Sequence, residues 1–215
     1  MTFRGEGPTL PLQQDDEVGE MADRDVRGGL GHNGGPTLER GASWRRHCWS
    51  AARRHLLPTL PLEVIRTRVA RAKALGLDYP TYATIRATGG GDIVAFLFSS
   101  NALRLLRERD ELPKMHTARL SAIERAGRIA LACPPLDAAR LEERLRESGA
   151  PLDAARPAPG FPAGWGHQRK ALLAALAPER FSPGRVVLVG DTGLEREWCA
   201  AGMLAGYVPA DTYFS

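Results

Sequence analysis

The chain has 215 residues, 43% hydrophobic and 25% charged, which is enough for one full-sized domain or for one domain with a small appendage. Its three cysteines lie far apart and form no CxxC pair, which excludes a zinc ribbon and a thioredoxin-like redox site. The net charge of +4 is unevenly distributed, because ten basic and two acidic residues give +8 between Arg40 and Arg86. This asymmetry favours an anionic partner.

Residues 1–40 mix Gly, Pro, Asp, Glu and Gln without periodicity, and they are predicted to form a disordered N-terminal tail. The tail lacks an apolar stretch of the kind found in secretory signals. The longest apolar runs, at 93–98 and 186–190, are of strand length and too short to span a bilayer. We therefore expect a cytoplasmic protein with no membrane partner.

Within the tail, the string GHNGGP (Gly31–Pro36) is a run of turn-forming residues. It resembles a motif of an uncharacterised bacterial, often alphaproteobacterial, protein family, and much of the chain is similar to that family. The resemblance implies a bacterial lineage and supplies no activity. By itself the string is interpreted as flexible chain or as a short docking motif.

Residues 41–90 are predicted to form a basic helical subdomain. Apolar residues recur at helical spacing between Ser43 and Pro58, and again between Leu62 and Leu75. Gly76 suits the end of the second helix, and Pro80 suits the first turn of a third. The arginines lie off the apolar stripes.

The segment Arg68–Ala87 resembles a DNA-binding helix-turn-helix. Ala72 and Gly76 have the spacing of the small residue and the turn glycine in that motif. Tyr82 departs from the motif, which places a β-branched aliphatic residue there. A plain helical hairpin packed on the rest of the protein is the alternative interpretation.

The arginines need not read bases, because contacts to phosphate groups alone give salt-sensitive binding. Trp44 and Trp49 are candidates for base stacking or for the core. The cations are either a phosphate-binding surface or a solvated helical face. The candidate nucleic-acid-binding residues are Arg45, Arg46, Arg53, Arg54, Arg66, Arg68, Arg71 and Lys73.

Residues 91–215 are predicted to form an α/β domain, a small three-layer structure with a mostly parallel sheet. Strands are expected at 93–98, 128–133 and 185–190, where the apolar runs show no polar alternation. Helices are expected at 99–112, 116–127, 135–149, 166–180 and 191–206. A Pro/Gly-rich loop is expected at 150–166, and the C-terminal tail is a candidate for a fourth strand at the edge of the sheet.

Polar residues follow the predicted strands, and ligands of open parallel sheets gather at the carboxyl ends of the strands. The ligand-binding candidates for a phosphate-bearing molecule are Ser99, Ser100, Asn101, Asp191 and Thr192. The same residues are also ordinary helix caps, and Thr192 with Glu195 forms the sequence pattern of a capping box.

The two strand–polar segments, SSN and GDT, resemble two motifs of haloacid-dehalogenase-type phosphatases. That family carries an aspartate nucleophile in a DxD pattern directly after its first strand, where this chain has Ser99-Ser100-Asn101. The resemblance therefore does not extend to phosphatase activity.

No residue is predicted to be catalytic, and the five histidines lack ligand spacing, so neither a metal site nor a cofactor is predicted. The sequence favours a non-enzymatic binding or regulatory protein whose Arg-rich helices engage nucleic acid. One alternative is an enzyme or sensor that binds a phosphate-containing small molecule at the strand ends. A second is a protein–protein interaction module that docks on an acidic partner, and the oligomeric state stays open.

Overall fold

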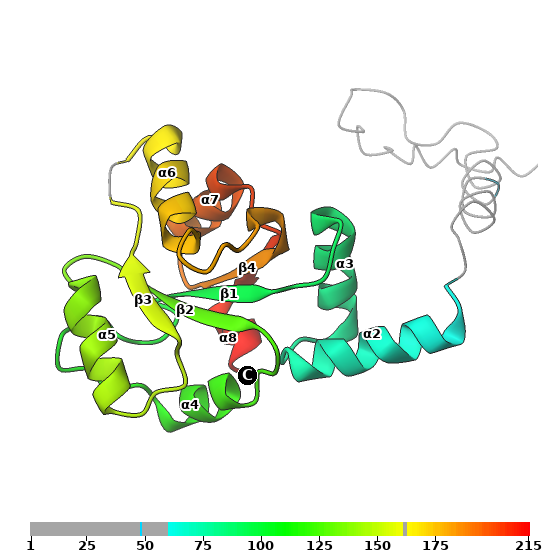
Figure 1. Ribbon diagram of the computed structural model, residues 1–215, viewed down its shortest axis with the longest axis horizontal. Coiled ribbons are helices and arrows are strands. Elements are labelled where there is room, and N and C mark those ends of the chain that lie inside the picture. Colours follow the sequence, from blue (N-terminus) through cyan, green and yellow to red (C-terminus); the bar gives the residue numbers. More distant parts are fainter. Residues whose placement is uncertain (1–47, 49–59, 161–162) are drawn as a thin grey trace, which may run out of the picture. The chain divides into compact units, whose positions relative to one another are not determined.

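The computed structural model describes Cys48, residues 60–160 and residues 163–215. Its centre is a five-stranded sheet in which every neighbouring pair of strands is parallel, in the order β3-β2-β1-β4-β5 (Figure 1). The strands are β1 (Ala95–Ser99), β2 (Gly127–Ala132), β3 (Ala154–Pro157), β4 (Val186–Gly190) and β5 (Gly206–Pro209). The predicted α/β class is therefore confirmed.

Helices cover both faces of this sheet (Figure 1). They are α2 (Leu62–Ala74), α3 (Tyr79–Gly89), α4 (Lys114–Ser121), α5 (Ala138–Glu147), α6 (Trp165–Leu176), the short 3₁₀ helix η1 (Pro183–Arg185), α7 (Gly193–Gly202) and α8 (Ala210–Tyr213). None of the described helices is long and apolar enough to cross a membrane.

The central strand β1 is buried on both faces, as its uniformly apolar sequence requires. Phe96 and Phe98 belong to the core shared with α3, α4, α5 and α8. Leu97 belongs to the second core, which α6 and α7 cover with residues such as Leu172 and Trp198. Because successive side chains of a strand point to opposite faces, one five-residue strand supplies both cores.

The second half of α2 and the whole of α3 pack on the sheet. Ala72, Leu75, Tyr82 and Ile85 are buried in the same core as Phe96. In the first half of α2, the predicted apolar stripe is largely exposed, with Leu62 at 59%. The predicted tail at 1–40 lies outside the described residues, and so does the predicted helix that follows Ser43, except for Cys48.

The helix predicted at 99–112 is wrong, because this segment forms consecutive turns. The Ser99 hydroxyl accepts a hydrogen bond from the Ala102 amide at 3.0 Å. The Asp110 carboxylate accepts bonds from the amides of Leu106 and Arg107 at 2.8 and 2.7 Å. Short polar side chains that bond nearby amides compete with the helical hydrogen bonds, and here they prevail.

The predicted loop at 150–166 is wrong at its centre, where Ala154–Pro157 forms β3 and pairs with β2. Two contacts from α5 hold this edge strand, since the Glu142 carboxylate accepts bonds from the Ala155 amide and the Arg156 guanidinium. The C-terminal tail supplies the opposite edge strand, β5, and then the short helix α8.

Candidate functional site

The strand order reverses direction between β1 and β4. The chain leaves β1 toward β2 and leaves β4 toward β5, so the segments that follow these two adjacent strands diverge. In open α/β sheets, the crevice beyond the carboxyl ends of such a strand pair is the usual ligand site. The structure brings all five predicted ligand-binding residues to this place, which we call the rim: Ser99, Ser100, Asn101, Asp191 and Thr192.

The two serines of the rim are buried, at 0% and 1% exposure. Their hydroxyls bond to backbone amides and do not face an open surface. Ser99 caps the turn after β1 through the Ala102 amide. The Ser100 hydroxyl accepts a bond from the Cys133 amide at 3.2 Å and so ties the end of β1 to the end of β2. Both side chains fix the shape of the rim.

Glu195 is the central group of the rim, and its carboxylate is completely buried. One oxygen accepts bonds from the amides of Asp191 and Thr192, and the other accepts one from the Asn101 side-chain amide at 2.9 Å. The Thr192 hydroxyl accepts a bond from the Glu195 amide, which completes the predicted capping box. The sequence revealed Glu195 as a cap but not its link to Asn101.

Cys133 closes the buried side of the rim. Its sulfur lies 3.8 Å from Asn101 Nδ2 and 3.9 Å from a Glu195 carboxylate oxygen. Burial, above all, raises the pKa of the thiol, and the neighbouring Glu195 charge acts in the same direction. The thiol is therefore protonated at neutral pH and is unsuited to nucleophilic attack.

Arg104 covers the solvent side of the rim, a role that the sequence did not reveal. Its guanidinium bonds Asp191 at 2.8 Å and Asp211 at 3.1 Å, which joins the segment after β4 to α8. A hollow of about 180 Å³ lies beside it, lined by Ala102, Arg104, His116, Ala210, Asp211, Phe214 and Ser215.

Across the described part of the chain, no group of three or more His, Cys, Asp or Glu side chains is arranged to hold a metal ion.

The predicted nucleic-acid-binding arginines behave differently from one another. Arg71 is a structural residue, with a guanidinium that reaches Asp92 at 3.0 Å and the backbone oxygens of Ile93, Glu124 and Arg125 at 2.8–3.1 Å. These bonds tie α2 to the chain entering β1 and β2. Arg45, Arg46, Arg53 and Arg54 lie outside the described residues.

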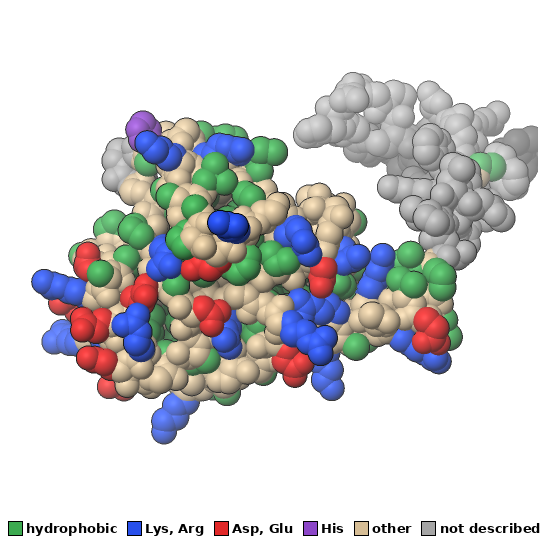
Figure 2. Space-filling model, in the orientation of Figure 1, with side chains coloured by type: hydrophobic (Ala, Val, Ile, Leu, Met, Phe, Trp, Pro, Cys, Tyr) green, Lys and Arg blue, Asp and Glu red, His purple; other side chains and the backbone are tan. Residues whose placement is uncertain are grey.

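Three other predicted cations lie on α2. Arg66 is exposed and pairs with Glu63 at 2.8 Å. Arg68 and Lys73 form no ion pair with any residue that the structure describes. Lys and Arg side chains gather where α2 meets the body of the protein, with acidic side chains beside them (Figure 2).

A hollow of about 410 Å³ lies between α2 and α3, and we call it the α2–α3 hollow. Its lining residues are Glu63, Val64, Thr67, Arg68, Arg71, Tyr82, Arg86 and Asp92. Burial opposes ionisation of Asp92, but hydrogen bonds from Tyr82 and Arg71 hold the pKa of that carboxyl below its ordinary value. Asp92 is therefore charged at neutral pH. The formal charges of the lining residues, three arginines against Glu63 and Asp92, sum to +1.

The segment that resembles a helix-turn-helix, Arg68–Ala87, covers the second half of α2, the turn and most of α3. Gly76 adopts a left-handed φ of +70°, and Ala72 is buried in the same core as Tyr82. However, the exposed residues of α3 include Thr84 and Thr88, whose hydroxyls donate to the backbone oxygens of Pro80 and Thr84. This face offers few groups that can reach base edges.

Comparison of the chain with protein-family models, with curated proteins and with solved structures gives no match. The class that the fold defines is an open, doubly wound α/β protein with a polar rim at its switch point.

Proposed function

We propose that this chain is a non-enzymatic binding protein that engages the phosphate groups of a nucleic acid through the basic residues of α2 and α3. The α2–α3 hollow carries the proposal, because Arg68 and Arg86 line it together. Arg86 lies 3.8 Å from Asp92, a weaker contact than the 3.0 Å bond of Arg71 to the same carboxylate. The hollow, of about 410 Å³, leaves room for a phosphate group.

Electrostatic attraction to the whole chain supports the same proposal. The window from Arg40 to Arg86 carries +8 in the sequence and the remainder carries −4, a charge asymmetry that favours association with an anionic partner. Phosphate contacts without base contacts give binding that tolerates different sequences and weakens steeply with salt. The few polar groups on the exposed face of α3 suit this mode better than base readout.

The test is a titration of the full chain against mixed-sequence labelled DNA and RNA at several salt concentrations. We expect log K to fall linearly with log salt, and the double variant Arg68→Gln/Arg86→Gln to reduce the slope by about 2, one phosphate contact for each cation lost. A matched control, Arg140→Gln/Arg169→Gln, removes the same charge from exposed positions on α5 and α6.

Two results would overturn the proposal. One is the absence of binding even at low salt. The other is an equal loss in the control variant, which would mean that net charge attracts the nucleic acid and that the α2–α3 hollow contributes nothing specific.

A second candidate function is the binding of a phosphate-bearing small molecule at the rim. The observation that favours it is the position of Asn101, Asp191 and Arg104 at the β1–β4 switch point. A thermal-shift screen with nucleotides and sugar phosphates should show stabilisation that grows with ligand concentration and disappears in Arg104→Gln. A flat screen would leave these residues as structural caps.

A further inference from the structure

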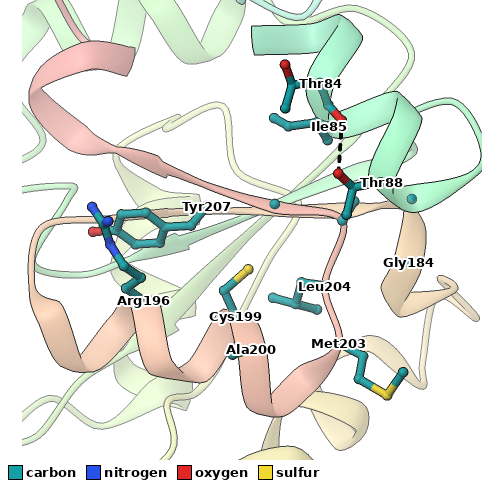
Figure 3. Close-up of a pocket in the computed structure, with 13 residues that line it drawn as sticks. Thr84, Ile85, Thr88, Gly184, Arg196, Cys199, Ala200, Met203, Leu204 and Tyr207 are labelled. Carbon is teal, nitrogen blue, oxygen red and sulfur yellow. Dashed lines mark hydrogen bonds between the residues drawn. The ribbon is translucent and has the colours of Figure 1, made fainter. Parts of the chain in front are cut away.

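A third cavity lies outside the α2–α3 hollow and borders the rim, since the Tyr207 hydroxyl in its wall donates to the Thr192 backbone oxygen at 3.3 Å. It is a groove of about 730 Å³ between α3 and α7, beside the edge strand β5 (Figure 3). Its lining residues are Thr84, Ile85, Thr88, Gly89, Gly184, Arg196, Cys199, Ala200, Met203, Leu204, Ala205, Gly206 and Tyr207. This volume falls in the range of small-molecule sites.

Three glycines line the groove, and two of them let neighbouring segments approach closely. A Cβ at Gly89 would lie 2.2 Å from the Gly184 carbonyl oxygen, and a Cβ at Gly206 would lie 2.8 Å from Ile85. These contacts hold the end of α3 against η1 and β5. Close packing of α3 against η1 and β5 therefore forms this side of the groove.

The walls of the groove are mostly apolar. Ile85 and Leu204 contribute side chains, and Met203 lines the groove with 66% of its surface exposed. The hydroxyls of Thr84 and Thr88 donate to the backbone of their own helix, so they are already satisfied. Burial raises the pKa of the Cys199 thiol to about 11, which keeps it neutral. These walls suit the hydrocarbon part of a small-molecule ligand.

Arg196 is the charged residue at one end of the groove, where its guanidinium lies over the Tyr207 ring at 4.9 Å (Figure 3). No other lining residue is ionised at neutral pH, and Arg196 makes no ion pair within the described ranges. The ring supports the planar guanidinium from one side and leaves its donors available. A guanidinium in this position matches a carboxylate, which it can bind through two parallel bonds.

We propose that this groove binds a small apolar monocarboxylate, with its carboxylate on Arg196 and its hydrocarbon body between α3 and α7. The charge complementarity of Arg196 selects the anionic end, and the apolar walls select the body. The proposal does not depend on nucleic-acid binding, because Arg196 and the groove lie outside the α2–α3 hollow.

The experiment uses the full chain with decanoate as the probe, below the concentration at which it aggregates, and with 1-decanol as the uncharged probe of equal chain length. We expect saturable binding of decanoate by calorimetry, a rise in melting temperature, and about tenfold weaker binding of decanol, since a charge-assisted hydrogen bond is lost. Arg196→Gln should weaken decanoate binding by the same factor and leave decanol unchanged.

A second variant tests the groove itself. Ala200 is exposed on α7, so Ala200→Trp fills the groove without disturbing the core, and it should abolish binding of both probes. Arg169→Gln on α6 removes the same charge as Arg196→Gln at an exposed site and should bind decanoate like the parent chain. Equal affinity for decanoate and decanol, or binding that survives Ala200→Trp, would overturn the proposal.

Discussion

Asn101 and Glu195 lie 94 residues apart in the chain, and the Asn101 side-chain amide donates to a Glu195 carboxylate oxygen at 2.9 Å. This bond joins the turn after β1 to the helix after β4, across the two central strands. The carboxylate is completely buried and accepts two backbone amides as well. The bond therefore fixes the relative positions of the two segments that form the rim.

Glu195→Gln should destabilise the protein by about 2 kcal/mol, because one carboxylate oxygen is replaced by an NH₂ group that cannot accept a bond from Asn101 or from the two backbone amides. Urea denaturation followed by circular dichroism measures this loss. Glu197→Gln is the control, since Glu197 is exposed on the same helix, and it should change stability by less than about 0.5 kcal/mol. Equal effects of the two variants would contradict the role of Glu195.

Arg71→Ala should destabilise the chain by about 3 kcal/mol, because it removes the Arg71 donor from one oxygen of Asp92 and from three backbone oxygens. Arg68→Ala, one helical turn earlier, should change stability by less than about 0.5 kcal/mol. Denaturant titration distinguishes the two variants. If instead Arg71→Ala is stable and only weakens polynucleotide binding, Arg71 is a phosphate contact and not a structural residue.

The strands that could be predicted from the sequence are those with a purely local signal. The runs at 93–98, 128–133 and 185–190 are apolar throughout, and β1, β2 and β4 lie there within two residues. The strand β3 has no such signal, because Ala154–Pro157 is short and ends in proline. Its stability comes from distant partners, since Arg156 pairs with Glu142 and with Glu179.

The same contrast between local sequence signals and contacts with distant residues applies to the candidate site. The residues of the rim could be predicted because the carboxyl ends of parallel strands share one edge of the sheet. The link between Asn101 and Glu195 and the cover by Arg104 could not, because each depends on the packing of segments 87 to 107 residues apart. The bonds of Arg71 could not be predicted for a related reason, since nothing in its own helix shows that the starts of β1 and β2 lie beside it.

The lowered pKa of Asp92 predicts that the free energy of unfolding decreases in acid. The pKa of the folded-state carboxyl is held below its ordinary value despite burial, by bonds from Tyr82 and Arg71. A depressed pKa contributes stability that is complete above the unfolded value, about 4, and is lost as the pH falls through the lower folded value. The stability difference between the parent chain and Asp92→Asn should therefore be largest near neutral pH and shrink below about pH 4. A stability difference between the two proteins that grows as the pH falls would contradict this prediction.

The thiols should differ in reactivity. Burial raises the pKa of Cys133 and of Cys199, the latter to about 11, whereas Cys48 is exposed. Alkylation of the native chain by iodoacetamide at pH 7.5, followed by peptide mass spectrometry, should modify Cys48 first and leave the other two largely unmodified until the chain is denatured, because the thiolate is the reactive form. Rapid modification of Cys133 in the folded chain would show that the rim opens.

Gly89→Ala should destabilise the chain by about 2 kcal/mol or more, because the added Cβ would meet the Gly184 carbonyl oxygen at 2.2 Å, and neither backbone can move without disturbing α3 or η1. The contact is made by backbone, so no change of side-chain conformation relieves it. Gly166→Ala in α6 is the matched control, since its Cβ meets nothing within 4 Å and it should be neutral or slightly stabilising. Thermal unfolding of the two variants measures the difference. Because Gly89 also lines the groove beside β5, any Gly89→Ala protein that still folds should bind decanoate more weakly than Gly166→Ala.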